Sequence, residues 1–366
     1  MLSAAVRAPE FTEATSAALN SAGMVTIALD AEHTRHSHAG IARYARSLAT
    51  AMRKLPQLNV VELGGGEVVQ RGTLRKKLLT ARHDLFWYPL LARRKAARIG
   101  ADIYHSPLLR GPLNKGLPPF VMTVHDLVPV RWPDTMPRWH RFYTARVLRR
   151  LLDAADRIIT PSLDTADDLN ALLFVPPEKI RVVPNGVDNL FFGKARSGAN
   201  GPYVLFVGTP EPRKNLTRLI SAMTILRERG FRERLVVVGG GGWGDDFAQN
   251  EVVHHVGRIG DDELHSLYAN ASCLALPSLH EGFGLPALEA MAAGTPVVAG
   301  NAGALPEVTG GAAVLVDPQS ATNIADGISR AILEKDRLVV AGRDRAREFT
   351  WDRAAALTAA VYRELV

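Results

Sequence analysis

The chain has 366 residues, of which 47% are hydrophobic and 22% charged, a balance typical of a soluble globular protein and not of a disordered or fibrous one. This length exceeds what a single core usually supports, so we expect two domains. The single cysteine, Cys273, excludes a disulfide framework and favours a reducing, cytoplasmic location, and no apolar run reaches the roughly 18 residues that a membrane-spanning helix needs.

The net charge of +7 is concentrated in the first half of the chain. Residues 1–185 contain 26 Lys and Arg and 16 Asp and Glu, a balance of +10, whereas the remaining residues contain 18 and 21, a balance of −3. Such a concentration indicates a polyanionic partner, either lipid head groups or nucleic acid. Because we identify no module that reads or stacks bases, lipid explains the basic half better.

The chain begins with residues 1–23, which we expect to be a flexible leader because they lack the compact apolar run of a signal peptide. A buried strand is predicted over 24–30, followed by a loop and by a helix over 40–48. Gly40, at the start of this helix, lets the backbone approach a phosphate closely, or is a plain turn glycine.

Three histidines, His33, His36 and His38, stand in the loop before Gly40. Zinc ligands need a scaffold and usually a cysteine or carboxylate partner. We therefore expect a solvated or acceptor-facing loop and no metal.

Residues 71–98 carry nine Lys and Arg and one acid, Asp84, with large apolar residues such as Phe86 and Trp87 among them. Basic and apolar residues interleaved in this way suit a surface that lies on anionic lipid. They suit equally a solvated helix whose apolar face packs on its own domain, and the sequence leaves both open.

Two short strands predicted at 103–106 and 120–126 end in polar residues, the second in His125 and Asp126. Ligands bind at the carboxyl ends of strands in open α/β sheets, which makes this pair a candidate site. The alternative is a structural His-Asp pair, because polar residues at strand ends also cap helices.

The rest of the chain alternates strands and helices, which predicts doubly wound parallel sheets. We expect a helix over 137–156, a strand over 158–160, and a helix over 164–172 with Ser162 as its N-cap. Further strands are predicted at 203–207, 235–238, near 256, and at 273–276, 297–299 and 313–316. A last helix is predicted over 351–366.

Arg213 and Lys214 follow one of these strands and precede a helix. Cations suit a diphosphate, and they are unfavourable beside a helix N-terminus unless an anion lies there. The pair therefore predicts a phosphate site, with a solvated pair as the alternative.

Two carboxylates, Glu281 and Glu289, are separated by seven residues that open as a glycine loop and then start a helix at 285–286. The free N–H groups of the loop and the helix dipole would face an anion beyond the strand 273–276. Spacing alone leaves open an ordinary turn with two solvated glutamates.

Residues 280–298, His-Glu-Gly-Phe-Gly-Leu-Pro-Ala-Leu-Glu-Ala-Met-Ala-Ala-Gly-Thr-Pro-Val-Val, resemble the donor-sugar signature of glycosyltransferase family 4. The resemblance implies an α/β protein of the GT-B fold, with two doubly wound Rossmann-like domains facing a central cleft. It implies an acceptor-binding domain at 24–185, a linker at 186–202 with a Pro-Asn-Gly-Val-Asp crossing, a nucleotide-sugar-binding domain at 203–349, and a C-terminal helix at 350–366 that folds back on the first domain.

The resemblance also implies roles for single residues. Glu289 binds the ribose hydroxyls, Glu281 binds the donor-sugar hydroxyls, and His125 contacts the sugar near the reacting carbon. Arg213 and Lys214 stabilise the departing diphosphate, next to Thr209, where many relatives have an arginine. The remaining donor-binding positions are Gly40, Asp126, Phe283, Gly284 and Leu285.

The activity implied is retaining transfer of a hexose from a nucleotide sugar to a lipid-linked or oligosaccharide acceptor at the cytoplasmic face of the membrane. The segment 208–215, Gly-Thr-Pro-Glu-Pro-Arg-Lys-Asn, resembles a subgroup rich in GDP-mannose users. The chain has no D-x-D motif and no evident double-displacement carboxylate, so we expect metal-independent, same-face substitution without a cofactor. The alternatives are a nucleotide-sugar epimerase of the same fold and a non-catalytic nucleotide-binding subunit.

Overall fold

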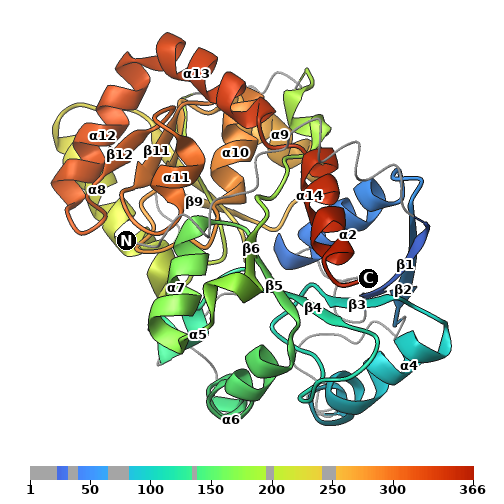
Figure 1. Ribbon diagram of the computed structural model, residues 1–366. Helices are drawn as coiled ribbons and strands as arrows, with labels where there is room; N and C mark the ends of the chain where they lie inside the picture. The colour runs from blue at the N-terminus through green and yellow to red at the C-terminus, as the bar shows by residue number, and fades with distance from the viewer. Residues whose placement is uncertain (1–22, 32–39, 65–81, 134–137, 195–201, 241–252) are drawn as a thin grey trace. The chain divides into compact units, whose positions relative to one another are not determined.

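The computed structural model describes residues 23–31, 40–64, 82–133, 138–194, 202–240 and 253–366 (Figure 1), without the side chains of 138–145. The chain divides into two compact units. Unit 1 contains Met1–Gly186 and Trp351–Val366, and unit 2 contains Val187–Thr350. The predicted leader, apart from Gly23, lies outside the described residues, as do His33, His36 and His38 and the linker residues 195–201.

Unit 1 is built on a six-stranded parallel sheet in the order β2-β1-β3-β4-β5-β6. Its strands are β1 (Val25–Asp30), β2 (Leu58–Leu63), β3 (Ile103–Ser106), β4 (Phe120–Thr123), β5 (Arg157–Thr160) and β6 (Ile180–Val182). Most of these strands are buried along nearly their whole length because helices cover both faces of a parallel sheet.

Helices cover the two faces of this sheet. They are α2 (Gly40–Met52), the π-helix η2 (His83–Leu91), α4 (Ala92–Arg98), α5 (Val128–Arg131), α6 (Arg138–Ala154), α7 (Leu163–Leu173), the short 3₁₀ turn η4 (Pro177–Lys179) and α14 (Trp351–Arg363). On one face, α2 and the C-terminal α14 lie side by side (Figure 1) and pack on Ile27 and Leu29. On the other face, α4 and α7 pack on Ala28 and Met122. Successive residues of β1 thus enter different cores.

Unit 2 repeats this architecture with the strand order β12-β11-β10-β7-β8-β9, all parallel. Its strands are β7 (Tyr203–Val207), β8 (Arg234–Val238), β9 (Val253–Gly257), β10 (Cys273–Leu276), β11 (Val297–Gly300) and β12 (Val314–Val316). Its helices are η5 (Asn189–Phe192), η6 (Pro212–Lys214), α8 (Leu216–Glu228), α9 (Asp261–Asn270), α10 (Leu285–Ala293), α11 (Leu305–Thr309), α12 (Ala321–Leu333) and α13 (Lys335–Arg347).

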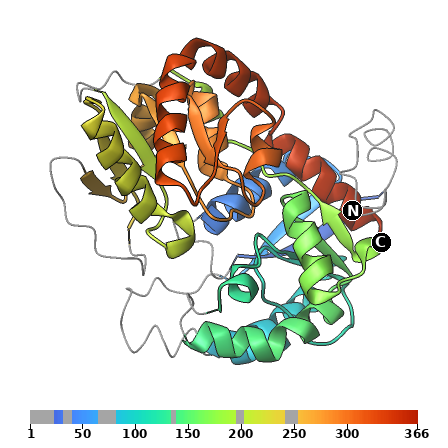
Figure 2. The same cartoon turned by 90° about the vertical axis from the view of Figure 1, so that its left-hand side faces the viewer.

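Successive residues of β7 point to opposite faces of the sheet and so enter two different cores. Leu205 and Val207 pack with α9 and α10, whereas Val204 and Phe206 pack with α8 and α12. Figure 2 shows α8 and α12 side by side on that second face. Two doubly wound parallel sheets therefore confirm the predicted fold class.

Most predicted elements are present, and two strands, β2 and β6, were not predicted. Ser162 caps α7 by accepting a hydrogen bond from the Thr165 backbone N–H at 3.2 Å, and Cys273 is fully buried in β10. The sequences of these strands, Leu-Asn-Val-Val-Glu-Leu in β2 and Ile-Arg-Val in β6, are interrupted by polar residues because they lie at the two edges of the sheet. Among the described residues, no helix combines the length and the apolar character of a membrane span.

Candidate active site

The strand order of unit 2 reverses between β7 and β10. The chain runs outward from β7 through β8 and β9 on one side, and β10 pairs with the other side of β7. Ligands of open parallel sheets bind beyond the carboxyl ends of the strands at such a reversal. The segments that leave these two strands, residues 208–215 and 277–284, are therefore the first place to look for a site.

Three charged side chains from these two segments form a buried cluster. Lys214 Nζ donates to Glu281 Oε1 at 2.5 Å, and Arg213 Nη1 donates to Glu281 Oε2 at 3.2 Å. The Ser278 hydroxyl also donates to Glu281 Oε1, at 2.8 Å. Glu281 is 5% exposed and Lys214 8%. The structure thus brings together three of the four predicted catalytic residues.

The cluster keeps Glu281 ionised. Burial by itself raises the pKa of this carboxyl, but the charges of Lys214 and Arg213, together with hydrogen bonds from Lys214 and Ser278, outweigh it and lower the pKa to about 2. Arg213 has a second carboxylate partner, because its Nε donates to Glu211 Oε2 at 2.9 Å. Arg213 and Lys214, the two cations at the start of α8, are therefore paired with the carboxylates of Glu281 and Glu211 in the same chain.

Asn215 joins the two segments. It adopts a left-handed backbone conformation, with φ of 61°, between η6 and α8. Its side-chain amide donates to the carbonyl of Pro277 at 2.8 Å and to that of Pro318 at 2.6 Å, and the Leu279 backbone N–H donates to the Arg213 carbonyl at 2.8 Å. These bonds set the position of Arg213 and Lys214 relative to the Glu281 loop.

The loop between β11 and α11 contacts the backbone of Glu281. Gly303, with φ of +59°, lies so close that a Cβ there would be 2.7 Å from both the N and the O atom of Glu281. The Ala304 backbone N–H donates to the Glu281 carbonyl at 2.9 Å. Gly284, with φ of +99°, precedes α10, and a Cβ there would be 2.7 Å from Leu305. Only glycine suits these two positions.

Glu289 lies one turn into α10 and is 4% exposed. Its Oε2 accepts a hydrogen bond from the Tyr268 hydroxyl of α9 at 2.8 Å. The carbonyl of Tyr268 in turn accepts a bond from the Thr295 hydroxyl at 2.6 Å, just after α10. Glu289 is thus a buried, oriented carboxylate and not a solvated one.

The other predicted donor-binding residues of unit 2 lie along the same edge. Leu285 is the first residue of α10, and Thr209 is half-buried just after β7. The Phe283 side chain turns into the core, where its ring packs edge-on against Phe349 at 5.9 Å. Only the backbone of Phe283 is therefore available to a ligand.

In unit 1, His125 and Asp126 follow β4 in a loop and are half-buried. His125 Nε2 lies 3.0 Å from the Pro107 carbonyl, which only accepts, so Nε2 carries the hydrogen. Burial lowers the pKa of His125, against the opposing effects of the Pro107 bond and of Asp126. Asp126 Oδ1 accepts from the Val128 backbone N–H at 3.2 Å, although Leu127 and not Asp126 is the N-cap of α5. Gly40 is exposed at the first position of α2.

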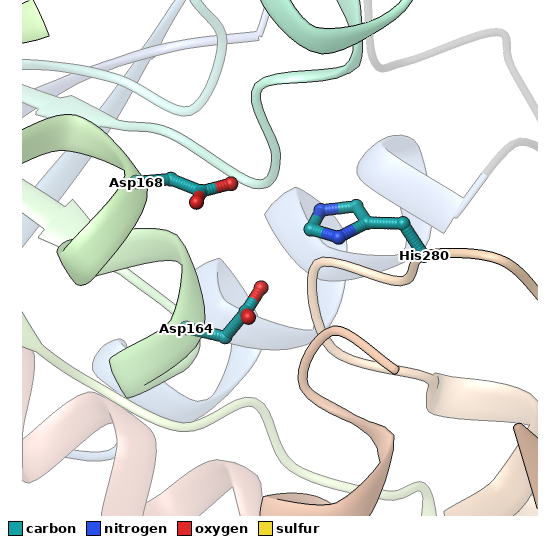
Figure 3. A group of neighbouring side chains, drawn as sticks. All are labelled: Asp164, Asp168 and His280. Atoms are coloured by element: carbon teal, nitrogen blue, oxygen red, sulfur yellow. The ribbon is translucent and has the colours of Figure 1, made fainter. Parts of the chain in front are cut away.

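Two acidic residues of α7 were not among the predicted site residues. Figure 3 shows Asp164 and Asp168 on the same side of the helix, one turn apart. Asp168 accepts two hydrogen bonds from Arg131, one of them from Nε at 2.6 Å. Their i, i+4 spacing places the two acids on one side of a helix, but it does not mark them as site residues, because such spacing is common on solvated helices. Figure 3 also shows His280 in the loop after β10, where its carbonyl accepts a bond from Arg213 at 3.3 Å.

Comparisons with known proteins agree with this fold. The sequence model described as "Glycosyltransferase Family 4" matches residues 38–189, and "Glycosyl transferases group 1" matches residues 188–348. Among solved structures, sucrose-phosphate synthase from Thermosynechococcus elongatus superposes with a TM-score of 0.69 at 23% identity, covering 93% of this chain and 99% of that one. The fold is therefore that of the GT-B glycosyltransferases.

Two curated relatives are similar in sequence. The O-antigen chain mannosyltransferase B of Escherichia coli is 31% identical over 308 residues, which cover 76% of this chain and 79% of that protein. The GDP-mannose-dependent alpha-(1-6)-phosphatidylinositol monomannoside mannosyltransferase of Mycobacterium tuberculosis is 31% identical over 250 residues, which cover 60% and 64%. The chain belongs to glycosyltransferase family 4 and is a glycosyltransferase.

Proposed function

We propose that this protein transfers mannose from GDP-mannose, with retention of configuration, to a lipid-linked or oligosaccharide acceptor. The observation that carries the proposal is the buried cluster of Glu281, Lys214 and Arg213 at the strand reversal of unit 2. The names of the two mannosyltransferase relatives support the sugar, and one of them supports the nucleotide. Neither an epimerase nor a non-catalytic subunit finds support in these comparisons.

The donor diphosphate is assigned to Arg213 and Lys214. Both cations are already paired with carboxylates, so a bound diphosphate shares them with Glu281 and Glu211 instead of meeting bare charges. A Lys ammonium has three donor hydrogens and an Arg guanidinium has five, so each can serve a carboxylate and a phosphate at once. Glu281 then retains acceptor capacity for donor-sugar hydroxyls, and Glu289 accepts from the ribose.

The transfer step is a substitution on one face of the sugar. The bond between the anomeric carbon and the diphosphate oxygen breaks, and the acceptor hydroxyl oxygen bonds to the same face. The acceptor proton passes to the departing phosphate, whose charge Arg213 and Lys214 stabilise. The step requires no metal and no cofactor.

His125 is assigned to a hydroxyl of the transferred sugar. Its lowered pKa keeps the imidazole neutral near pH 7, and the Pro107 carbonyl occupies Nε2–H. The atom left for a ligand is Nδ1, which in this tautomer only accepts a hydrogen bond. His125 therefore orients a hydroxyl donor and does not supply a proton.

A membrane surface is assigned to the helical pair η2 and α4. Trp87 anchors η2 by donating to Asp30 Oδ2 at 3.1 Å, and Asp84 pairs with Arg110 at 2.9 Å. The opposite side exposes apolar side chains next to basic ones: Leu85, Phe86, Leu90, Leu91, Arg94, Lys95 and Arg98. Such a surface suits anionic lipid at the cytoplasmic face, where a lipid-linked acceptor resides.

The donor assignment is tested by titrating the protein calorimetrically with GDP-mannose, GDP-glucose, UDP-glucose and UDP-N-acetylglucosamine. We expect GDP-mannose to bind most tightly, and more weakly in Lys214→Ala. Equal affinity for GDP and UDP sugars would contradict the nucleotide assignment, and a preference for GDP-glucose would contradict the sugar.

A further inference from the structure

A chain of four buried polar side chains begins behind His125 and ends in the C-terminal helix. The Tyr44 hydroxyl lies 3.0 Å from Thr123 Oγ1, which lies 2.9 Å from His105 Nε2. His105 Nδ1 lies 2.6 Å from the hydroxyl of Tyr362 in α14. Tyr44, His105 and Tyr362 are between 0% and 2% exposed, and Thr123 is 1% exposed. All four belong to unit 1, although 318 positions separate the first from the last.

The directions of these bonds follow from the last partner. The Tyr362 hydroxyl donates to Met52 Sδ at 3.6 Å, so its oxygen accepts from His105 Nδ1–H. His105 Nε2 is then an acceptor, and the Thr123 hydroxyl donates to it. Thr123 Oγ1 is left to accept from Tyr44. Each hydroxyl thus donates to one defined partner.

His105 is the link that makes this order stable. Burial, and to a smaller extent the neighbouring His125, lower the pKa of His105 to about 3, so the ring stays neutral with a single N–H. The Tyr362 oxygen selects the Nδ1 tautomer. A protonated ring would place a second N–H against Thr123 and reverse that bond.

Tyr44 connects the chain to His125 through its ring. The two ring centroids are 4.6 Å apart with an interplanar angle of 81°. The edge-to-face contact restricts the tilt of the imidazole, while the Pro107 carbonyl holds its Nε2 edge. Two contacts, the aromatic one with Tyr44 and the hydrogen bond at Nε2, define the direction of Nδ1.

We infer that Tyr44 is a positioning residue for His125. Thr123 and His105 link Tyr44 to Tyr362 of α14, and this hydrogen-bonded chain holds Tyr44 in place. This inference rests on the proposed role of His125 and adds residues that the sequence pattern did not single out. It gives α14 a function beyond packing on α2 (Figure 1), because the last helix of the chain then sets the geometry of a residue that follows β4.

The test compares Tyr44→Phe, Thr123→Val and Tyr362→Phe with Tyr203→Phe. Each of the first three variants removes one hydroxyl group of the hydrogen-bonded chain and keeps the side-chain shape. Tyr203→Phe is the matched control, because it also removes a buried tyrosine hydroxyl, one that donates to the Leu267 carbonyl at 2.7 Å in unit 2. The full chain is labelled with ¹⁵N-histidine, and the His125 signals are assigned by their loss in His125→Asn.

We expect Tyr44→Phe and Thr123→Val to shift the His125 ring ¹⁵N signals, Tyr362→Phe to shift them less, and Tyr203→Phe to leave them unchanged. With donor and acceptor present, kcat should fall about 10-fold in Tyr44→Phe, because a small misplacement of a contact group costs rate. The KM for the nucleotide sugar should stay within twofold, since the nucleotide is bound by unit 2. The double variant Tyr44→Phe/Tyr362→Phe should lose less than the two single losses combined.

Unchanged His125 signals in both Tyr44→Phe and Thr123→Val would overturn the inference, whatever the transfer rates. Additive losses in the double variant would also count against it. Full activity of His125→Asn would instead contradict the proposed function of His125 and leave the spectroscopic result to decide the positioning claim on its own.

Discussion

The ammonium of Lys214 lies 2.5 Å from a carboxylate oxygen of Glu281, although the two residues are 67 positions apart in the chain. The pairing follows from the sheet, because β7 and β10 are adjacent and parallel and each residue follows one of them. It places a predicted phosphate ligand and a predicted sugar ligand in direct contact.

Replacing Lys214 with Ala should weaken GDP binding and lower kcat, because phosphate charge is present both in the bound donor and in the transition state. We expect at least a 10-fold loss in each quantity. Arg229→Ala is the matched control, since it removes an exposed cation that pairs with Asp326 on the surface of unit 2. Isothermal titration with GDP and initial rates measure the two effects, and equal behaviour of the two variants would contradict the phosphate assignment.

Replacing Glu281 should lower stability as well as transfer. The change Glu281→Ala leaves Lys214 buried without its carboxylate. The folded-state pKa of about 2 lies below the ordinary 4.5. The ion pair therefore stabilises the fold above about pH 4.5, and this stability, about 3 kcal/mol, is lost as the pH falls toward 2.

The pH dependence of the stability of Glu281→Gln measures the contribution of the Glu281 charge. Glutamine is neutral, as is protonated glutamate, so the variant and the unaltered protein should differ in urea midpoint at pH 7 and converge between pH 4 and pH 2. Glu211→Gln, which changes the other carboxylate bound to Arg213, serves as a comparison. A gap that stays constant over this pH range would show that the Glu281 charge contributes nothing.

Tyr268→Phe should weaken GDP binding about 5-fold, because the lost hydrogen bond to Glu289 is worth about 1 kcal/mol. The value of kcat should change little, since the ribose lies away from the reacting bond. Tyr203→Phe, which loses a bond to a backbone carbonyl in the same unit, should bind GDP normally. If Tyr268→Phe bound GDP as tightly as the unaltered protein, the orientation of Glu289 would not depend on this hydroxyl.

Chelation should leave transfer unchanged under the proposed mechanism, which assigns to Arg213 and Lys214 the part that a divalent cation plays at a diphosphate. Rates are measured after dialysis against EDTA and again after Mg²⁺ or Mn²⁺ is added. Complete loss of activity that only the divalent ion restores would contradict the metal-free mechanism.

The exposed side of η2 and α4 should bind anionic vesicles. Each basic residue near such a surface contributes up to about 1 kcal/mol, and 1 M salt weakens this term because the Debye length falls to about 3 Å. Co-sedimentation should fall in Arg94→Ala and Lys95→Ala, while Phe86→Ser should reduce the salt-resistant part. Arg229→Ala is the control for net charge. Equal pelleting with anionic and neutral vesicles would contradict the assignment.

Much of the fold was predictable from the sequence because both sheets are parallel and buried. Continuous apolar strands such as β7 and β10 are visible without any partner. The edge strand β2 is not visible in this way, because the polar residues Asn59 and Glu62 interrupt its apolar pattern. Arg93 was counted among the basic residues that could meet lipid, yet it is 8% exposed and donates to the carbonyls of Pro118 and Asn114.

The candidate site was predictable as a set of residues but not as a set of contacts. Motif spacing indicated Glu281, Arg213 and Lys214, and an anion was expected beside the two cations. The anions in the structure are carboxylates of the same chain, because β10 brings Glu281 beside the segment after β7. Tyr44, His105 and Tyr362 carried no motif at all, since their relationship exists only after α14 packs on α2.

The stereochemistry of donor hydrolysis tests the central claim most directly, with water in place of the unidentified acceptor. The full-length protein is incubated with GDP-mannose, and the first mannose released is observed by ¹H NMR before its anomers interconvert. Retaining substitution on the α-linked donor predicts α-mannose as the first product, with the signal reduced at least 10-fold in Lys214→Ala. Release of β-mannose first would contradict same-face substitution.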